Sequence, residues 1–92
     1  MYKRTPPKKI IHDIRASFIR VWEYDPSFES LIEELEFEID KINKRSLLYL
    51  REYDRTESSE RKELLKYIMD ENNEKLADYL EALETVKRGK YE

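Results

Sequence analysis

The feature that most constrains this chain is an unbroken heptad spacing of mostly apolar residues between positions 28 and 53. The steps alternate between four and three residues, which is the spacing of a coiled-coil seam. The seam consists of Phe28, Ile32, Leu35, Ile39, Ile42, Ser46, Tyr49 and Tyr53. At a rise of 1.5 Å per residue this stretch makes about 40 Å of helix. The spacing therefore predicts a long helix over about residues 26–54, with one face turned toward a partner helix.

A second seam with the same spacing follows after a short polar segment and supplies that partner. It consists of Leu65, Met69, Asn72, Leu76, Tyr79, Leu83 and Val86. Between the seams the segment DRTESSE is polar, and Thr56 and Ser58 are candidate helix caps. Lys87 and Arg88 followed by Gly89 are a typical helix end. We expect a helix over about residues 57–88 that folds back on the first as an antiparallel hairpin, with Ile39 opposite Asn72.

The residues before the first seam predict a shorter helix over about positions 8–24. Pro7 suits the first turn of a helix, and Pro26 ends it, so that Asp25 is a candidate cap for the next helix. We expect this helix to pack on the open end of the hairpin and to run alongside it, too short to reach the tip. The fold class is all-α, a three-helix arrangement in one domain of residues 1–92, with residues 1–7 as a flexible basic arm. The expected core is Ile11, Ile14, Phe18, Val21, Trp22, Ile32, Leu35, Ile39, Ile42, Leu76, Tyr79 and Leu83.

Composition narrows the class of protein further. The chain has 92 residues, 42% of them charged, and a mean hydropathy of -0.92, with no cysteine for a disulfide or a thiolate site. Its longest uncharged run, Ser46 to Leu50, is far too short for a membrane span or a signal peptide. Glutamine is absent and charge is abundant, a composition typical of thermophile proteins. We expect a cytoplasmic protein that does not bind membranes.

Charge is distributed unevenly along the chain although the net charge is only -3. Residues 1–24 carry six basic and two acidic side chains, whereas residues 25–40 carry seven acidic ones and no basic one. The remaining residues are balanced, with twelve of each sign. The acidic block could in principle hold a divalent cation or perform acid–base chemistry, but carboxylates on the outer face of one helix are more often simply solvated.

The tip of the predicted hairpin carries more apolar side chains than a two-helix seam can bury. Leu47, Leu48, Tyr49 and Leu50 are consecutive, so they point in nearly every direction around the helix. An apolar patch of this size indicates an interface on a soluble protein, unless the arm folds over it. The predicted interface comprises Leu47, Leu48, Leu50, Tyr49, Tyr53, Leu64, Tyr67 and Ile68. We expect either a homodimer or an accessory subunit of a larger protein complex.

A nucleic-acid-associated protein is the alternative from another class. The basic arm would lie near basic residues of the second helix, and together they would form a phosphate-binding patch. The candidate nucleic-acid contacts are Lys3, Arg4, Lys8, Lys9, Lys41, Lys44, Arg45 and Arg51. The acidic net charge and the lack of a nucleic-acid-binding motif weigh against it.

Two single residues invite a specific role. Asn72 lies on the second seam, where it either sets the register of the hairpin or lies at the edge of the packed region in solvent. His12 is the only histidine and has no second ligand at helical spacing, so a surface histidine is the better interpretation. We expect no metal, no cofactor, no small-molecule ligand and no catalytic residue.

A remote alternative is an enzyme. The segment LEFEIDKINKRSLLYL resembles the opening helix of the small all-helical chorismate mutases, which carry a Leu-Arg-x-x-Ile-Asp-x-Ile-Asn run followed by paired leucines. The resemblance covers about sixteen residues. Glu36 stands where that family has its active-site arginine, and three residues rather than two separate Asn43 from Leu47.

Overall fold

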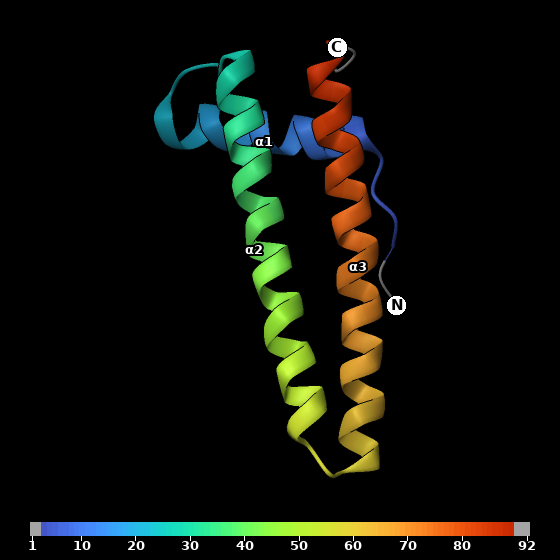
Figure 1. Cartoon of the computed structure of the whole chain (residues 1–92). Helices are drawn as coiled ribbons and strands as arrows, with labels where there is room; N and C mark the ends of the chain where they lie inside the picture. The colour runs from blue at the N-terminus through green and yellow to red at the C-terminus, as the bar shows by residue number, and fades with distance from the viewer. Residues whose placement is uncertain (1–2, 90–92) are drawn as a thin grey trace.

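Three helices and no strand make up residues 3–89, the part of the chain that the computed structural model describes. The helices are α1 (Pro7–Trp22), α2 (Phe28–Arg55) and α3 (Ser59–Lys87). Helices α2 and α3 form an antiparallel hairpin, and α1 lies on its open end (Figure 1). The all-α three-helix fold is therefore confirmed. The molecule is elongated, with principal extents of 49 × 22 × 20 Å.

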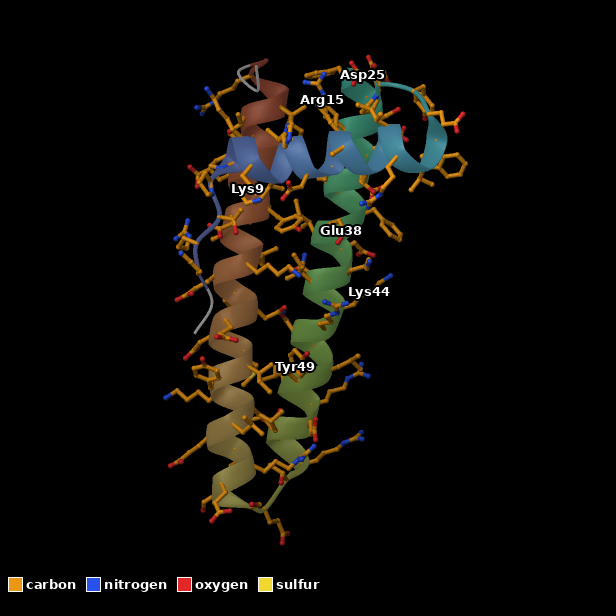
Figure 2. All side chains as sticks on the ribbon, turned by 180° about the vertical axis from the view of Figure 1, so that it is seen from behind. Lys9, Arg15, Asp25, Glu38, Lys44 and Tyr49 are labelled. Atoms are coloured by element: carbon orange, nitrogen blue, oxygen red, sulfur yellow. The ribbon has the colours of Figure 1, made fainter. Side chains whose placement is uncertain are left out.

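Side-chain caps begin the two long helices. The Ser58 hydroxyl accepts a hydrogen bond from the Arg61 backbone N–H and starts α3, and Pro7 stands at the start of α1, as the sequence predicts. The cap of α2 is Ser27, which accepts from the Ser30 N–H, so the expectation of Asp25 in this position is wrong. Asp25 instead accepts hydrogen bonds from the Arg15 guanidinium of α1, at 3.1 Å between Nη2 and Oδ2 (Figure 2).

Left-handed backbone conformations lie just beyond two helix ends. Gly89 follows α3 with φ 71°, the conformation that only glycine adopts freely, and its N–H donates to the carbonyl of Val86. Glu23 follows α1 with φ 60° although it carries a side chain. The turn into α2 therefore contains one strained residue.

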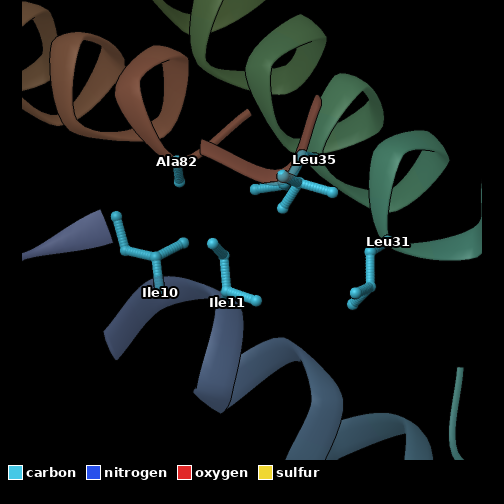
Figure 3. Packing of buried hydrophobic residues seen from close by; sticks show 6 residues of the cluster. Ile10, Ile11, Leu31, Leu35 and Ala82 are labelled. Atoms are coloured by element: carbon cyan, nitrogen blue, oxygen red, sulfur yellow. The ribbon is translucent and has the colours of Figure 1, made fainter. Parts of the chain in front are cut away.

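Helix α1 crosses the hairpin instead of running alongside it, which corrects the expected arrangement (Figure 1). Its first turns face α3 and α2, where Ile10 and Ile11 pack against Leu31, Leu35 and Ala82 (Figure 3). A transverse helix buries only the stretch that lies over its partners. Val21 and Trp22, expected in the core, therefore lie beyond α2 and are exposed, Trp22 by 65%.

The core consequently differs in detail from the expected set. The buried hydrophobic residues are Ile10, Ile11, Leu31, Leu35, Ile42, Leu65, Ala82 and Val86. Of the expected core residues, Ile11, Leu35 and Ile42 are among them. Those that are only partly buried are Ile14, Phe18, Ile32, Ile39, Leu76, Tyr79 and Leu83.

Asn72 links α3 to α2 by hydrogen bonds in the observed alignment. It is buried, and its side-chain amide donates to the Ile42 carbonyl at 3.0 Å and to the Ser46 hydroxyl at 2.7 Å. The expected pairing of Asn72 with Ile39 is therefore about one helical turn out of register. A buried amide that finds two acceptors in one register loses them in a shifted one, so Asn72 favours the observed pairing over its neighbours.

Candidate interaction surfaces

The tip of the hairpin exposes most of the apolar side chains that the sequence analysis assigned to an interface. Leu48 is 61% exposed and Leu47 is 58% exposed, and Leu50, Leu64 and Tyr67 are exposed to a similar degree. Tyr49, Tyr53 and Ile68 are partly buried between the helices. No third helix covers this end, since α1 lies at the other one (Figure 1).

The three exposed leucines that α2 contributes to the tip lie on two of its flanks, and Leu64 lies on α3. Successive residues of a helix are rotated by about 100°, which separates Leu47 and Leu50 from Leu48. On the flank of Leu48 a shallow groove of about 440 Å³ runs between the helices. It is lined by Leu48, Arg51, Glu52, Arg55, Thr56 and Arg61. This flank combines an apolar anchor with guanidinium groups, a pairing that is common at protein interfaces.

The described part of the arm lies against α3, away from the tip. The Arg4 guanidinium and the Thr5 backbone N–H both bond to Asp78, the latter at 2.9 Å, and Arg4 also lies 3.7 Å from Glu81. The Asp78 side chain is buried, whereas that of Arg4 is 61% exposed. The first two residues of the predicted arm lie outside the described residues.

The basic residues predicted to bind nucleic acid are spread over different parts of the molecule. Arg4 is engaged with α3 and Lys9 pairs with Asp13 on α1, while Lys44 projects from the far side of α2 (Figure 2). Lys44 and Lys41 pair with Asp40 and Glu38 of their own helix. Lys3, Lys8, Arg45 and Arg51 are exposed and have no ion-pair partner among the described residues. Arg51 lies at the tip, where it lines a groove together with Arg55 and Arg61.

A cluster of aromatic side chains at the end of α1 was not expected from the sequence. We call Phe18, Trp22, Tyr24 and Phe37 the aromatic corner. With Ser30, Glu33 and Glu34 they line a hollow of about 520 Å³ between the overhanging end of α1 and the outer side of α2. The rings of Phe18 and Tyr24 meet edge to face at 6.2 Å. The only sequence signal was Phe37, alone on an acidic helix face; it is 57% exposed.

A groove beneath α1 is lined by both charged and apolar side chains. It has a volume of about 530 Å³ and is lined by Lys9, Asp13, Glu38, Lys75 and Tyr79 together with Thr5, Ile10, Ile14, Ser17, Phe18, Trp22 and Glu34. Burial, and then the negative charges of Glu38 and Asp13, raise the pKa of the Tyr79 hydroxyl above 10.0. Two cations of the groove have local contacts: Lys9 pairs with Asp13, and the Lys75 ammonium lies over the Tyr79 ring.

Metal-binding and membrane-spanning features do not emerge from residues 3–89. No three histidine or acidic side chains in that range converge to hold an ion, and His12 is exposed. None of α1, α2 and α3 combines the length and the apolar character that a membrane crossing requires. Comparisons of the chain with protein-family models, with curated proteins and with solved structures found no match.

Proposed function

We propose that this chain is a small cytoplasmic protein-interaction module that assembles through the apolar tip of its helical hairpin. Its partner is a second copy or a larger complex in which it is an accessory subunit. The observation that supports this most directly is the exposure of Leu47, Leu48, Leu50 and Leu64 at an end that α1 leaves bare. Burying one such leucine in an interface contributes about 1.5–3 kcal/mol, which favours association over solvation.

Tyrosines extend this surface. Tyr49, Tyr53 and Tyr67 lie among the tip leucines and have the amphipathic side chains that often dominate binding energy. The Lys62 ammonium lies over the Tyr53 ring at 5.4 Å. The tip therefore offers aliphatic anchors, aromatic rings and cations in one place.

The test is a charged substitution at the tip with a matched control. Leu48→Glu should convert an assembled species to the 11.3 kDa monomer in sedimentation velocity, because a carboxylate would be desolvated at the interface. Leu80→Glu changes a comparably exposed leucine of α3 away from the tip and should leave the assembly intact. If both variants assemble like the unmodified chain, or fail equally, the tip is not the interface.

A larger complex is tested by the same pair of variants. A binding partner retained from the native source by the unmodified chain and by Leu80→Glu should be lost with Leu48→Glu. Retention by all three would contradict the proposal. Binding to DNA or RNA that is lost on neutralising Lys3, Arg4, Lys8 and Lys9 would favour the nucleic-acid alternative, and turnover of chorismate would favour the enzyme that the α2 segment resembles.

A further inference from the structure

We propose that the partner is a second copy of this chain, docked antiparallel along the outer side of α2, so that the tip of each copy lies in the aromatic corner of the other. This deepens the proposed function and rests on it, because the tip is one of the two surfaces in contact. Two features carry it: the order of side chains along the exposed side of α2 and the overhang of α1.

A mixed stripe of polar, charged and apolar residues runs along α2 outside its buried side, and we call it the outer seam. It consists of Ser30, Glu34, Phe37, Lys41, Lys44, Leu48, Arg51 and Arg55. Ser30, Glu34 and Lys41 each precede a buried residue of α2 by one position, so the outer seam is turned about 100° from the buried side. Figure 2 shows Lys44 of this seam pointing away from α3, on the side where α1 extends past α2. Only Phe37 and Leu48 of this stripe are large apolar residues, so a second helix docked along it would be held by these two anchors and by charge pairs.

The outer seam is complementary to the same seam of a second copy that runs antiparallel to it. Around a point midway between Lys41 and Lys44, Phe37 lies opposite Leu48 of a second, antiparallel helix, and Glu34 lies opposite Arg51. Phe37 and Leu48 are the two exposed large apolar residues of the seam, and eleven residues, about 16 Å, separate them. In an arrangement with two-fold symmetry each contact occurs twice, so one chain supplies both halves of every pair.

The charge of α2 fits the same pairing. From Glu29 to Asp40 the helix carries six acidic side chains and no basic one, and from Lys41 to Arg55 it carries five basic and two acidic ones. The helix dipole explains charges only in the first and last turns. Between them Glu33, Glu34, Arg45 and Arg51 have no ion-pair partner among the described residues. An antiparallel second copy brings its basic half to this acidic half.

Lys41 and Lys44 of the two copies would lie close together at the two-fold axis, but their repulsion is reduced by acidic neighbours. Lys41 and Lys44 each pair with an acidic neighbour, at 3.3 Å to Glu38 and 2.9 Å to Asp40. The Lys41 ammonium also lies over the Phe37 ring at 5.3 Å, which lays its aliphatic stem along the seam. The four lysines that meet at the two-fold axis are thus locally neutralised.

The overhang of α1 gives the second copy a site with two walls. Trp22 and Tyr24 line one hollow together with Phe37 and Glu34, two residues of the outer seam. The tip that would enter it carries Leu48, Arg51 and Arg55, which line the groove of the tip. Leu48 would pack against aromatic rings, which buries apolar surface. The guanidinium groups would pair with carboxylates and stack on the tryptophan ring, and both contacts are favourable.

Charge reversal in two separate variants tests the pairing. Glu34→Arg and Arg51→Glu each place like charges opposite one another at two points of the dimer, and each should raise the dimer dissociation constant about tenfold or more. Mixing the two variants creates a heterodimer with opposite charges at both points: the two introduced side chains face each other at one, and the native Glu34 and Arg51 face each other at the other. This mixture should recover the dissociation constant of the unmodified chain to within about threefold in sedimentation at low salt.

The matched controls carry the same charge changes at exposed positions off the outer seam. Glu36→Arg on α2 and Lys87→Glu at the open end of α3 should each change the dissociation constant less than about twofold, and their mixture should behave like either alone. Circular dichroism verifies that every variant is folded. Trp22→Ala should weaken the dimer although Trp22 is far from the tip of its own chain.

Cysteine cross-linking checks the orientation by an independent route, since the chain has no cysteine of its own. Under mild oxidation a mixture of Phe37→Cys and Leu48→Cys should form a disulfide-linked heterodimer, while each variant alone should form little. Abundant cross-linking within each variant alone would indicate a parallel arrangement and overturn the proposal.

The outcomes separate this inference from the proposed function. In one outcome Leu48→Glu dissociates the dimer, but mixing Glu34→Arg with Arg51→Glu does not recover the dissociation constant of the unmodified chain. The tip would then remain an interface, and its docking in the aromatic corner would be overturned. A chain that is monomeric at every concentration would overturn the second copy as partner and leave the tip for a different protein. A dimer indifferent to Leu48→Glu would overturn both.

Discussion

The two ends of the hairpin are built from the same helices but differ in what covers them. At the open end α1 crosses α2 and α3, and Ile10, Ile11, Leu35 and Val86 are buried together. At the tip only two helices meet, and among the residues from Leu47 to Ile68 only Leu65 is buried. A third helix buries side chains on the flanks of the seam, whereas two helices alone leave those flanking side chains exposed to water. Burial is therefore greatest at the open end, and the exposed tip is the surface for which we propose a binding role.

The largest effect should come from truncating the core at the open end. Leu35→Ala removes a fully buried side chain between three helices and should lower the free energy of unfolding by about 2–5 kcal/mol. Leu47→Ala at the tip should lower it by less than about 1 kcal/mol, because Leu47 is already exposed. Urea denaturation of both variants at the same protein concentration measures the contrast, and equal losses would refute it.

The attachment of the arm should matter less than the core. Asp78→Ala removes the acceptor of the Arg4 and Thr5 hydrogen bonds and should cost about 1–3 kcal/mol. Arg4→Ala should cost less, because its guanidinium is mostly in solvent. Thermal unfolding ranks the two variants. A greater loss for Arg4→Ala would contradict this ranking.

Relief of backbone strain at the open end should raise the stability of the protein, in contrast to the two preceding substitutions. Glu23→Gly replaces a residue at φ 60° and should stabilise the turn that carries the overhang of α1 by about 1 kcal/mol. Gly89→Ala is the matched case with the reverse sign, since Gly89 has φ 71° and open space around it. Melting temperatures should move up for the first variant and down for the second; movement in one direction for both would exclude this account.

The smallest effect should appear at high pH. The pKa of Tyr79 is raised in the folded protein, chiefly by burial, so the neutral phenol is the form that folding favours. This contribution to stability is complete below pH 10 and is lost as the pH rises through the folded pKa. Tyr79→Phe should lose less stability than the unmodified chain between about pH 9 and pH 11. Parallel losses measured by denaturation would show that Tyr79 is not responsible.

The helices could be read from the sequence because their signals are local. Pro7, Ser58 and Gly89 act within one turn of the helix ends that they mark, and the heptad seams predict both long helices and their antiparallel pairing. The exposed leucines of the tip follow from the same counting. The aromatic corner did not, because its four aromatic residues come from two helices and the turn between them and meet only once α1 has its final direction.

The sequence by itself determined three helices, a hairpin and the apolar excess at its tip, since spacing and capping act over a few residues. Only the tertiary structure decided that α1 crosses the hairpin, that Trp22 is exposed and Asp78 buried, and that Asn72 faces Ile42 and Ser46. Helical periodicity specifies which face of a helix is apolar but leaves its crossing direction and its register open by a turn. Packing and buried hydrogen bonds between residues distant in sequence determine the crossing direction and the register.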